Sequence, residues 1–442
     1  RFIVRGLVAR FVVVEVMVGL VGGFSSALLF LAFGYSTSFH LVLYLLVLIV
    51  GILVGLEIPL LMRILRDRFE FKDVVSNVLT FDYLGALGAS LLFPIVLVPK
   101  LGLVRAPMLF GALNVAVALW TTIVLKSSLG ARRFLQAGCI AALALLGVGM
   151  VYANTILELS EASLYPDDVI LARTTPYQRI VMTSWKDDLR LFLNSNLQFS
   201  SRDEYRYHEA LVHPGLAALP SARRILILGG GDGLALREVL RYPNIEHVTL
   251  VDLDPAMTQL FSTHPDLTRL NHGSLTDPRV HVINDDAFSW LDASKDVFDF
   301  AIVDFPDPSN FSLGKLYTTT FYRLLRQRLT PDATFVVQAT SPLFARQSYW
   351  CIVETVEQAG LHAAPYHVYV PSFGEWGYVL AGRNPIPPTG PLPSGLRFLT
   401  AGSLHDLFAF PADMARVEVE PNRLNTQALV RYYEQEWRAV NR

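Results

Sequence analysis

Four aspartates each follow a short apolar run that has the composition of a buried strand. The runs are 225–228, 248–251, 280–283 and 300–303, and the acids that follow them are Asp232, Asp252, Asp286 and Asp304. Because the carboxyl ends of parallel strands meet at one edge of an open α/β sheet, we expect these acids to share a rim. A single strand-end aspartate usually caps a turn or a helix. Four on one rim predict a ligand that is cationic and rich in hydroxyl groups.

The first of these strands ends in three consecutive glycines that open a helix. Gly229 and Gly231, the first and the third, permit a tight turn and a close approach of the backbone to a ligand. A dinucleotide site would have a glycine in place of Leu234, and the carboxylate of Asp232 would repel phosphate. Asp252 lies where a doubly wound fold places a carboxylate on ribose hydroxyls. These features favour a cationic nucleoside such as an S-adenosyl sulfonium compound; a glycine turn without a ligand is the alternative.

The elements that position these acids predict a doubly wound, Rossmann-like α/β domain of the S-adenosylmethionine-methyltransferase type over residues 213–384. Further strands at 334–338, 367–370 and 378–381 and helices at 317–329 and 349–359 belong to it. Two apolar, β-rich runs, 169–185 and 189–198, predict a hairpin in a small β-domain over 165–212. A proline-rich linker and a C-terminal helical tail, with a helix at 426–438, occupy residues 385–442.

The first third of the chain is far more apolar than the rest. Of the 442 residues, 52% are hydrophobic and only 17% are charged, which is unusual for a soluble enzyme. Five apolar stretches each approach the ~20 residues that cross a bilayer as a helix. They are 11–34, 39–62, 78–98, 103–125 and 134–153. We therefore predict a multi-span α-helical membrane domain over residues 1–155, placed in the cell (inner) membrane; buried helices of a soluble core are the alternative.

Polar residues interrupt these stretches at Glu15, Glu57, Asp82 and Asn114. Acids inside a membrane are costly and often functional, which leaves a polyamine or proton path open. The simpler interpretation, which we favour, has Glu57 and Asp82 near span ends beside arginines, where they only anchor the helices. Small-residue spacings at Gly51, Gly55, Gly85 and Gly88 predict close helix packing.

The remaining composition excludes several classes of protein. The formal net charge is −2, so nothing indicates a nucleic-acid partner. Cys139 lies in a predicted span and Cys351 outside it, so neither a disulfide framework nor a zinc site is implied. The chain begins with Arg1 rather than Met, and we expect the natural chain to be longer.

Several motifs resemble those of the spermidine synthase family, the polyamine aminopropyltransferases. They are Thr175-Pro-Tyr-Gln178, Gln198, Arg202-Asp-Glu-Tyr-Arg-Tyr-His-Glu209, Ile227-Leu-Gly-Gly-Gly-Asp-Gly233, Leu236-Arg-Glu238, Asp252-Leu-Asp254, Asp285-Asp286 and Asp304-x-x-Asp-Pro308. They occur in the family's order over about 174–381. The apolar stretches before them are similar to the membrane-embedded bacterial branch of that family.

The resemblance implies a donor side for decarboxylated S-adenosylmethionine, the co-substrate. Asp286, next to Asp285, would bind the adenine amino group, and Asp252 would bind the ribose hydroxyls. Asp232 would hold the amine of the aminopropyl group, and Gln178 would border the nucleoside.

The resemblance also implies an acceptor side for putrescine or a related amine. Asp304, assisted by Tyr207, would take the proton of the attacking amine, while Asp307, His208 and Gln198 would line the amine's binding site. A diamine is doubly protonated at neutral pH, so a carboxylate must accept a proton before the nitrogen can attack. The sulfonium is already a good leaving group, so no metal or further cofactor is expected, and methylthioadenosine is the by-product.

The chain departs from the family pattern on the acceptor side. Soluble members continue the Asp-x-x-Asp-Pro loop with Gly-Pro and an acid, whereas Lys315 lies in the segment that follows here, an odd neighbour for a dication. Phe373 stands where many members have tyrosine. Glu375 could supply a replacement anion and Trp376 a cation–π face, or both could be structural.

Two other functions stay open on the sequence. One is an S-adenosylmethionine-dependent methyltransferase on the same fold, which the anionic site disfavours because that donor carries a carboxylate. The other is a polyamine transporter or sensor whose soluble domain binds without catalysis. Whether the chain forms a homo-oligomer is not indicated by any motif.

The side of the membrane is a separate problem. Basic residues gather before the first span, after the second, and between the fourth and fifth: Arg1, Arg5, Arg10, Arg63, Arg66, Arg68, Lys72, Lys126, Arg132 and Arg133. The positive-inside rule makes these segments cytoplasmic, and five complete spans would then place the catalytic domain outside. The donor is made from cytosolic S-adenosylmethionine, so we instead predict a cytoplasmic catalytic domain, which requires that 134–153 does not cross.

Overall fold

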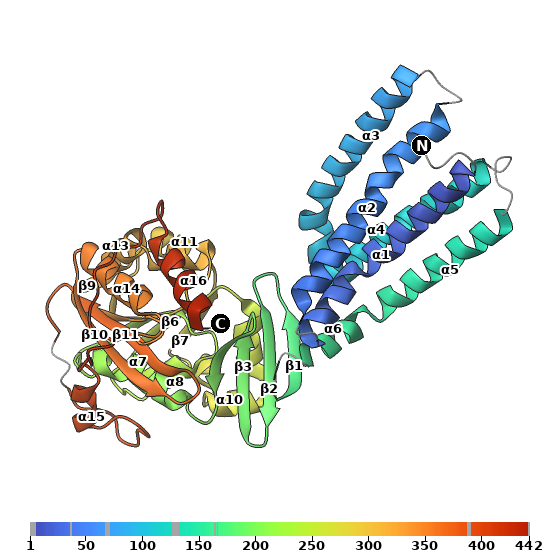
Figure 1. Ribbon diagram of the computed structural model, residues 1–442. Helices are drawn as coiled ribbons and strands as arrows, with labels where there is room; N and C mark the ends of the chain where they lie inside the picture. The colour runs from blue at the N-terminus through green and yellow to red at the C-terminus, as the bar shows by residue number, and fades with distance from the viewer. Residues whose placement is uncertain are drawn as a thin grey trace. The chain divides into compact units, whose positions relative to one another are not determined.

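The computed structural model describes residues 6–35, 38–66, 71–125, 132–162, 165, 167–386 and 390–440 (Figure 1). The chain forms two compact units, Arg1–Asp168 and Val169–Arg442. Four of the basic residues used above, Arg1, Arg5, Arg68 and Lys126, lie outside the described residues.

The first unit consists of helices. They are α1 (Leu7–Tyr35), α2 (Phe39–Leu65), α3 (Phe71–Leu92), a π-helical turn (Phe93–Leu97), α4 (Val98–Val124), α5 (Arg132–Val151) and α6 (Ala153–Ala162). Four described stretches, 7–34, 39–65, 72–124 and 132–151, are long and apolar enough to cross a membrane. The third of these is broken at Gly102, whose φ of 78° leaves the helical region, and α3 and α4 run in opposite directions (Figure 1). The five predicted stretches thus correspond to five long helices.

The close helix contact in this unit lies elsewhere than the sequence predicts. A Cβ atom at Gly111 of α4 would lie 2.2 Å from the carbonyl oxygen of Gly19 in α1, so these two helices touch through their backbones. At Gly51, Gly55, Gly85 and Gly88 a Cβ would meet nothing within 4 Å, so the prediction of close packing there is wrong. Spacing identifies a small-residue face, but which helix approaches it depends on the tertiary packing.

The second unit begins with a four-stranded antiparallel sheet. Its strands, in spatial order, are β1 (Asp168–Thr174), β2 (Arg179–Trp185), β3 (Asp188–Leu193) and β4 (Asn196–Ser200). Each β-rich run in the sequence therefore holds two strands rather than one. The first run is interrupted by the turn at 175–178, the second by Asn194 and Ser195, whose positive φ angles make a tight reversal.

A seven-stranded mixed sheet follows, in the order β10-β11-β9-β8-β5-β6-β7. The strands are β5 (Arg224–Gly229), β6 (His247–Asp252), β7 (Val280–Asn284), β8 (Phe298–Asp304), β9 (Leu329–Gln338), β10 (His362–Val370) and β11 (Gly374–Gly382). Strands β5 to β9 are parallel, and β11 is antiparallel to its neighbours. This is the doubly wound arrangement that the sequence predicts.

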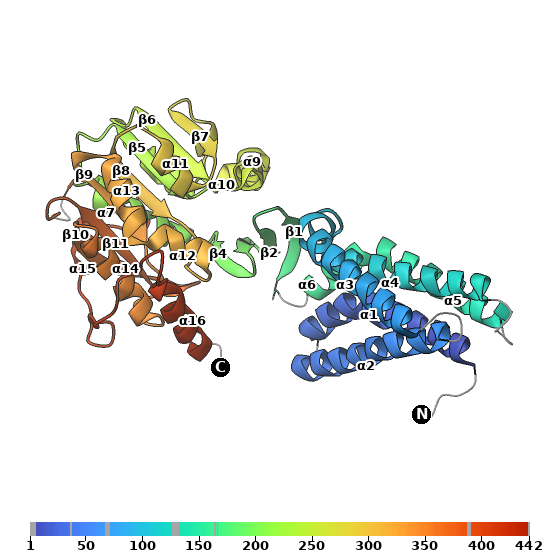
Figure 2. The same cartoon turned by 90° about the horizontal axis from the view of Figure 1, so that it is seen from above.

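Two hydrophobic cores cover the two faces of this sheet, as the alternation along β5 illustrates. Ile225 and Ile227 pack into one core with α7 (Glu204–Leu216), α8 (Leu234–Val239) and α9 (Pro255–Thr263). Leu226 and Leu228 pack into the other with α11 (Ala287–Ala293), α13 (Thr319–Gln327) and α14 (Arg346–Gln358). Figure 2 shows helices on both sides of the sheet.

The remaining helices are α10 (Pro265–Leu270), α12 (Phe311–Gly314), α15 (Ala401–Asp406) and α16 (Ala428–Val440), with short 3₁₀ turns at Ser274–Thr276 and Lys315–Tyr317.

The predicted boundary at residue 212 differs from the structure. Helix α7 runs through it without a break, and its Ala210 carbonyl accepts a hydrogen bond from the Tyr366 hydroxyl of β10 at 2.8 Å. This helix therefore packs on the large sheet, which brings its Tyr207 and His208 to the rim described next.

Candidate active site

The acids predicted to share a rim lie at the carboxyl edge of the parallel strands. In the register of the sheet, Gly229 of β5 stands opposite Asp304 of β8, and Asp252 of β6 stands opposite Asn284 of β7. Asp232 follows β5, and Asp286 follows β7 as the residue that caps α11. The structure therefore brings together the four carboxylates that the sequence placed on one rim.

The glycine turn lets two of these aspartates lie close to its backbone, Asp304 through its main-chain carbonyl and Asp252 through its carboxylate. At Gly229, where φ is +81°, a Cβ atom would lie 2.2 Å from the Asp304 carbonyl oxygen. At Gly231 a Cβ would lie 2.6 Å from Asp252 Oδ2; without one, the Gly231 N–H donates to that oxygen at 3.0 Å. The N–H of Asp254 donates to the other oxygen at 2.9 Å. Asp252 is thus fixed by two backbone donors and keeps lone pairs for a ligand.

Asp304 is the acid best suited to accept a proton. The hydroxyl of Tyr207 in α7 donates to Asp304 Oδ1 at 2.6 Å, while Oδ2 lies on the side of the glycine turn, 3.5 Å from where a Gly230 side chain would begin. Burial and the neighbouring Asp232 charge raise the pKa of Asp304 to about 6, against smaller lowering effects of His208 and Tyr207. A carboxylate with that pKa is ionised at neutral pH but is a stronger base than an ordinary aspartate.

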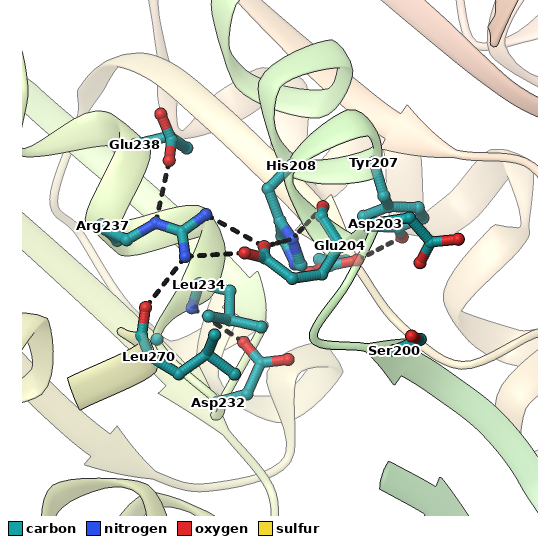
Figure 3. A network of polar contacts seen from close by, with 12 residues as sticks. Ser200, Asp203, Glu204, Tyr207, His208, Asp232, Leu234, Arg237, Glu238 and Leu270 are labelled. Atoms are coloured by element: carbon teal, nitrogen blue, oxygen red, sulfur yellow. Dashed lines mark hydrogen bonds and ion pairs between the residues drawn. The ribbon is translucent and has the colours of Figure 1, made fainter. Parts of the chain in front are cut away.

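His208 is held against this rim by a buried acid. Its side chain is 3% exposed, and its Nδ1 lies 2.8 Å from both the carbonyl oxygen and Oε2 of Glu204, one helical turn earlier (Figure 3). Nδ1 therefore carries the hydrogen, and Nε2 is left for another partner. Burial lowers the pKa of His208, but Glu204 and then the charges of Asp232 and Asp304 raise it above its ordinary value.

Glu204 is in turn held by Arg237 of α8. Arg237 Nη1 and Nη2 each donate to one oxygen of Glu204 at 2.9 Å, a bidentate pair between two side chains at most 8% exposed. Arg237 also binds Glu238 Oε1 at 2.8 Å and the Leu270 carbonyl at 2.9 Å (Figure 3). Glu204, Arg237 and Glu238 stand within the motifs quoted above, but their spacing in the sequence predicts no role for them. Their geometry makes them positioning residues, which fix His208 beside Asp232.

Asp232 and Asp286 both combine a capping role with a position on the rim. Asp232 Oδ1 accepts from the Leu234 N–H at 2.9 Å, and burial raises its pKa above the ordinary value. Asp286 Oδ1 accepts from the Ser289 N–H at 2.9 Å, and its Oδ2 binds Lys315 Nζ at 2.7 Å. Burial raises the pKa of Asp286, but Lys315 and Ser289 bring it below its usual range. Each acid thus accepts a backbone N–H at the start of a helix through its Oδ1, and its Oδ2 does not take part in this capping.

Lys315, the residue that departs from the family pattern, therefore faces the predicted donor side rather than the diamine. Asp285, also predicted on the donor side, is exposed and accepts the N–H of Asp286 at 2.8 Å.

Asp307 lies in a loop whose backbone is held by hydrogen bonds from two side chains. Gln338 at the end of β9 and Tyr317 both donate to the carbonyl of Phe305, which holds the loop between Asp304 and Asp307. Thr340 Oγ1 donates to Asp307 Oδ2 at 3.2 Å. Burial raises the pKa of Asp307 to about 6, against smaller lowering effects of its hydrogen-bond donors.

The closest of those donors comes from the C-terminal tail. The hydroxyl of Tyr433 in α16 donates to Asp307 Oδ2 at 3.0 Å. Helix α16 is held there by Glu436, which accepts from Ser348 N–H at 3.0 Å and Ser348 Oγ at 2.7 Å at the start of α14. The sequence predicts this helix but not its part in the site, because nothing local connects residues 126 positions apart.

Two glutamines predicted to border the ligand differ in their contacts. Gln178 Nε2 donates to Asp254 Oδ2 at 3.0 Å, which Thr175 Oγ1 also reaches at 2.8 Å, so the turn at 175–178 is attached to the end of β6 beside Asp252. Asp254, unassigned from sequence, is the residue that positions it. Gln198 Nε2 donates to the Asn196 carbonyl in its own strand at 3.2 Å.

The hairpin between β10 and β11 carries the remaining predicted residues. Glu375 Oε1 lies 2.5 Å from Nδ1 of His367, so this oxygen already has a hydrogen-bond partner. Trp376 packs on Phe373, with ring centroids 5.3 Å apart, and its buried indole N–H has no hydrogen-bond partner among the residues that the structure describes. Phe373 in turn contacts the Tyr207 ring at 6.1 Å. The contact with His367 favours a structural role for Glu375. The indole N–H of Trp376 stays available as a donor beside Phe373, the residue that contacts Tyr207.

Comparison with known proteins agrees with this geometry. The spermine/spermidine synthase domain matches residues 204–386. A protein of Leptospira interrogans named polyamine aminopropyltransferase is 54% identical over 440 residues, covering 100% of this chain and 88% of the relative. Polyamine aminopropyltransferase 2 of Ralstonia nicotianae is 55% identical, covering 99% and 87%. A Mycobacterium tuberculosis protein of the same name is 41% identical, covering 97% and 84%.

Solved structures resemble about half of this chain. A spermidine synthase in complex with the transition-state analogue AdoDATO superposes with a TM-score of 0.52 at 24% identity, covering 55% of this chain and 86% of that one. A spermidine synthase from Thermotoga maritima superposes with a TM-score of 0.51 at 24% identity, covering 55% and 85%. At this identity the likeness concerns the fold.

Proposed function

The chain belongs to the polyamine aminopropyltransferases, and we propose that the carboxylate rim of its second unit carries out the transfer. The reaction moves the aminopropyl group of decarboxylated S-adenosylmethionine to putrescine or a similar amine. The amine nitrogen forms a bond to the carbon next to sulfur, the carbon–sulfur bond breaks, and its electron pair leaves with methylthioadenosine. Binding donor and amine in line contributes much of the acceleration, because the sulfonium is already activated.

The observation that carries the proposed mechanism is the hydrogen bond from Tyr207 to Asp304. It fixes one carboxylate oxygen and leaves the other to accept the proton of the attacking ammonium. On the donor side, Asp252 receives the ribose hydroxyls and Asp232 the aminopropyl ammonium, with Asp286 and Lys315 beside the adenine. His208 is held in place by Glu204 and lies close to the carboxylates of Asp232 and Asp304.

On the acceptor side we propose that Asp307 binds the distal ammonium of a diamine and that Tyr433 keeps Asp307 ionised. The Tyr433 hydrogen bond lowers the pKa of Asp307, so Tyr433→Phe should raise that pKa above about 6 and protonate part of the acid at neutral pH. We expect KM for putrescine to rise roughly tenfold at pH 7, a loss typical of one hydrogen bond to a charged group. KM for the donor should stay constant. Steady-state kinetics from pH 5.5 to 9 measures both.

Tyr432→Phe is the matched control. Tyr432 directly precedes Tyr433 in α16, but its hydroxyl accepts a hydrogen bond from the Glu420 N–H instead of donating to Asp307. For a monoamine of the same length, KM should change little in Tyr433→Phe, because this substrate has no second ammonium for Asp307 to bind. Equal losses for monoamine and diamine would assign Tyr433 to folding rather than to recognition.

For the first unit we propose a position within a lipid bilayer. Its support is the length and apolar character of α1 to α5 and the exposed large side chains along them, such as Leu41, Tyr44 and Phe81. Such a surface would be costly in water over five helices. We further propose that the catalytic unit faces the cytoplasm, where the donor is made, which requires that α5, Arg132–Val151, does not cross the bilayer completely.

A reporter fused after Arg442 decides the side. Green fluorescent protein there should fluoresce in intact cells, and alkaline phosphatase should be inactive. An active phosphatase with no fluorescence would place the catalytic unit outside and contradict the cytoplasmic proposal. A fusion after Leu65 tests the basic segment independently and should behave as cytoplasmic.

A further inference from the structure

The four acids of the five long helices all line one cavity. They are Glu15 in α1, Glu57 in α2, and Asp73 and Asp82 in α3, and the cavity between these helices has a volume of about 470 Å³. Separate helices thus contribute carboxylates to a common space. The expectation that Glu57 and Asp82 only anchor span ends beside arginines is not met, because no described cation pairs with either.

Glu15 and one carboxylate oxygen of Glu57 are buried, and neither has a partner among the described residues. Glu15 is 7% exposed and lines the cavity, and no hydrogen bond or ion pair to it exists within the described residues. Glu57 Oε1 is buried and also has no hydrogen-bond partner in the part of the chain that the structure describes. An unpaired carboxylate in an apolar environment is strongly unfavourable. Two in one cavity indicate that a cationic ligand completes the site.

The acids lie at two levels. With a rise of ~1.5 Å per residue, Glu15 is about 12 Å from the start of α1 and Glu57 about 12 Å from the end of α2. Asp73 stands close to the start of α3, and Asp82, nine residues later, is about 13 Å deeper. Apolar side chains, among them Leu61 and Val78, line the cavity with these acids. The cavity therefore presents carboxylates at two levels along α3, together with an apolar lining.

This pattern fits a linear polyamine better than a metal ion. A metal needs several ligands converging on one point, and no group of three His, Cys, Asp or Glu side chains among the described residues does so. A linear triamine alternates ammonium groups with methylene chains. Its terminal nitrogens are nine bonds apart, about 11 Å when extended at about 1.2 Å per bond, which is close to the separation of the two acidic levels.

We propose that this cavity is a second polyamine site, separate from the catalytic rim and formed by Glu15, Glu57, Asp73 and Asp82. Ammonium groups pair with the carboxylates, and the methylenes pack on the apolar lining. The identity of the ligand rests on the function proposed above, since the chain itself uses and makes such amines. Binding at the cavity needs neither the donor nor the acids of the second unit.

Equilibrium binding of radiolabelled spermidine to the full chain in lipid nanodiscs tests the proposal, with methylthioadenosine release measured on the same samples. The unmodified chain should bind two molecules per chain, one at each site. The double variant Glu15→Gln/Glu57→Gln should lose one of the two, with kcat within about twofold of the unmodified value. Asp307→Asn should weaken the other by at least tenfold and keep the cavity site.

The conservative variant Glu57→Asp keeps the charge and should retain both bound molecules, whereas the single Glu57→Gln should weaken one of them. Full occupancy in the double variant, or a single bound molecule in the unmodified chain, would overturn the proposal. Displacement of the cavity-bound amine by a monoamine at equal concentration would also overturn it, because the two acidic levels would then be irrelevant. Absence of methylthioadenosine release with two bound amines would instead contradict the catalytic function and leave the cavity site standing.

Discussion

Replacing Asp304 with asparagine should reduce kcat by roughly a hundredfold or more while the nucleoside still binds. The amide keeps the shape and can still accept the hydrogen bond of Tyr207, but it cannot take the proton of the attacking ammonium. Single-turnover release of methylthioadenosine measures the chemical step, and fluorescence or calorimetric titration with methylthioadenosine measures binding. Asp296→Asn, at an exposed acid that pairs only weakly with Arg224, serves as the control for charge removal.

The pH dependence of the unmodified chain follows from the same acid. The folded pKa of Asp304 is raised to about 6, and so is that of Asp307, so both carboxylates become protonated as the pH falls through about 6. We therefore expect kcat/KM for the amine to be lost below about pH 6 and to be sustained above it. Near-normal turnover in Asp304→Asn, or an acid limb as low as pH 4, would remove Asp304 as the proton acceptor.

The second large effect concerns the choice of donor. Asp232→Asn should raise KM for decarboxylated S-adenosylmethionine roughly ten- to a hundredfold, because a charge-assisted hydrogen bond to the aminopropyl ammonium is lost. S-adenosylmethionine carries an additional carboxylate beside that amine, which the charge of Asp232 repels in the unmodified chain. The preference between the two donors should therefore narrow in the variant. Competition kinetics with both donors measures this ratio.

Methylthioadenosine provides an internal control for this variant, since it lacks the aminopropyl group. Its affinity should be unchanged when Asp232 is replaced. An equal loss of affinity for methylthioadenosine and for the donor would mean that Asp232 acts through the Leu234 cap and the shape of the turn rather than through charge.

The sequence predicts the rim well because its determinants are local. An apolar run that ends in glycine or aspartate marks the end of a buried parallel strand, and parallel strands must end on the same edge. Asp252 and Asp304 could therefore be placed together from their positions alone. The roles of these acids rest on the resemblance, and the mutations above are needed to assign them.

What the sequence does not reveal are contacts that depend on tertiary packing. Arg237 reaches Glu204 across 33 residues, and Tyr433 reaches Asp307 across 126, so no spacing rule relates either pair. The position of Lys315 after the Asp304 loop predicts that it lies near the amine, yet the fold brings it to Asp286. In the helical unit, Gly111 meets the Gly19-x-x-x-Gly23 face of α1, and the sequence alone does not show which of its several small-residue spacings receives a neighbouring helix.

The most direct test of the central claim is the reaction itself, followed with purified full chain, decarboxylated S-adenosylmethionine and putrescine. Chromatography and mass spectrometry should find methylthioadenosine and an aminopropylated amine in equal amounts, with neither formed when the amine is left out. S-adenosylmethionine in place of the decarboxylated donor should give negligible product. Formation of a methylated amine and S-adenosylhomocysteine from S-adenosylmethionine, without methylthioadenosine from the decarboxylated donor, would contradict the account.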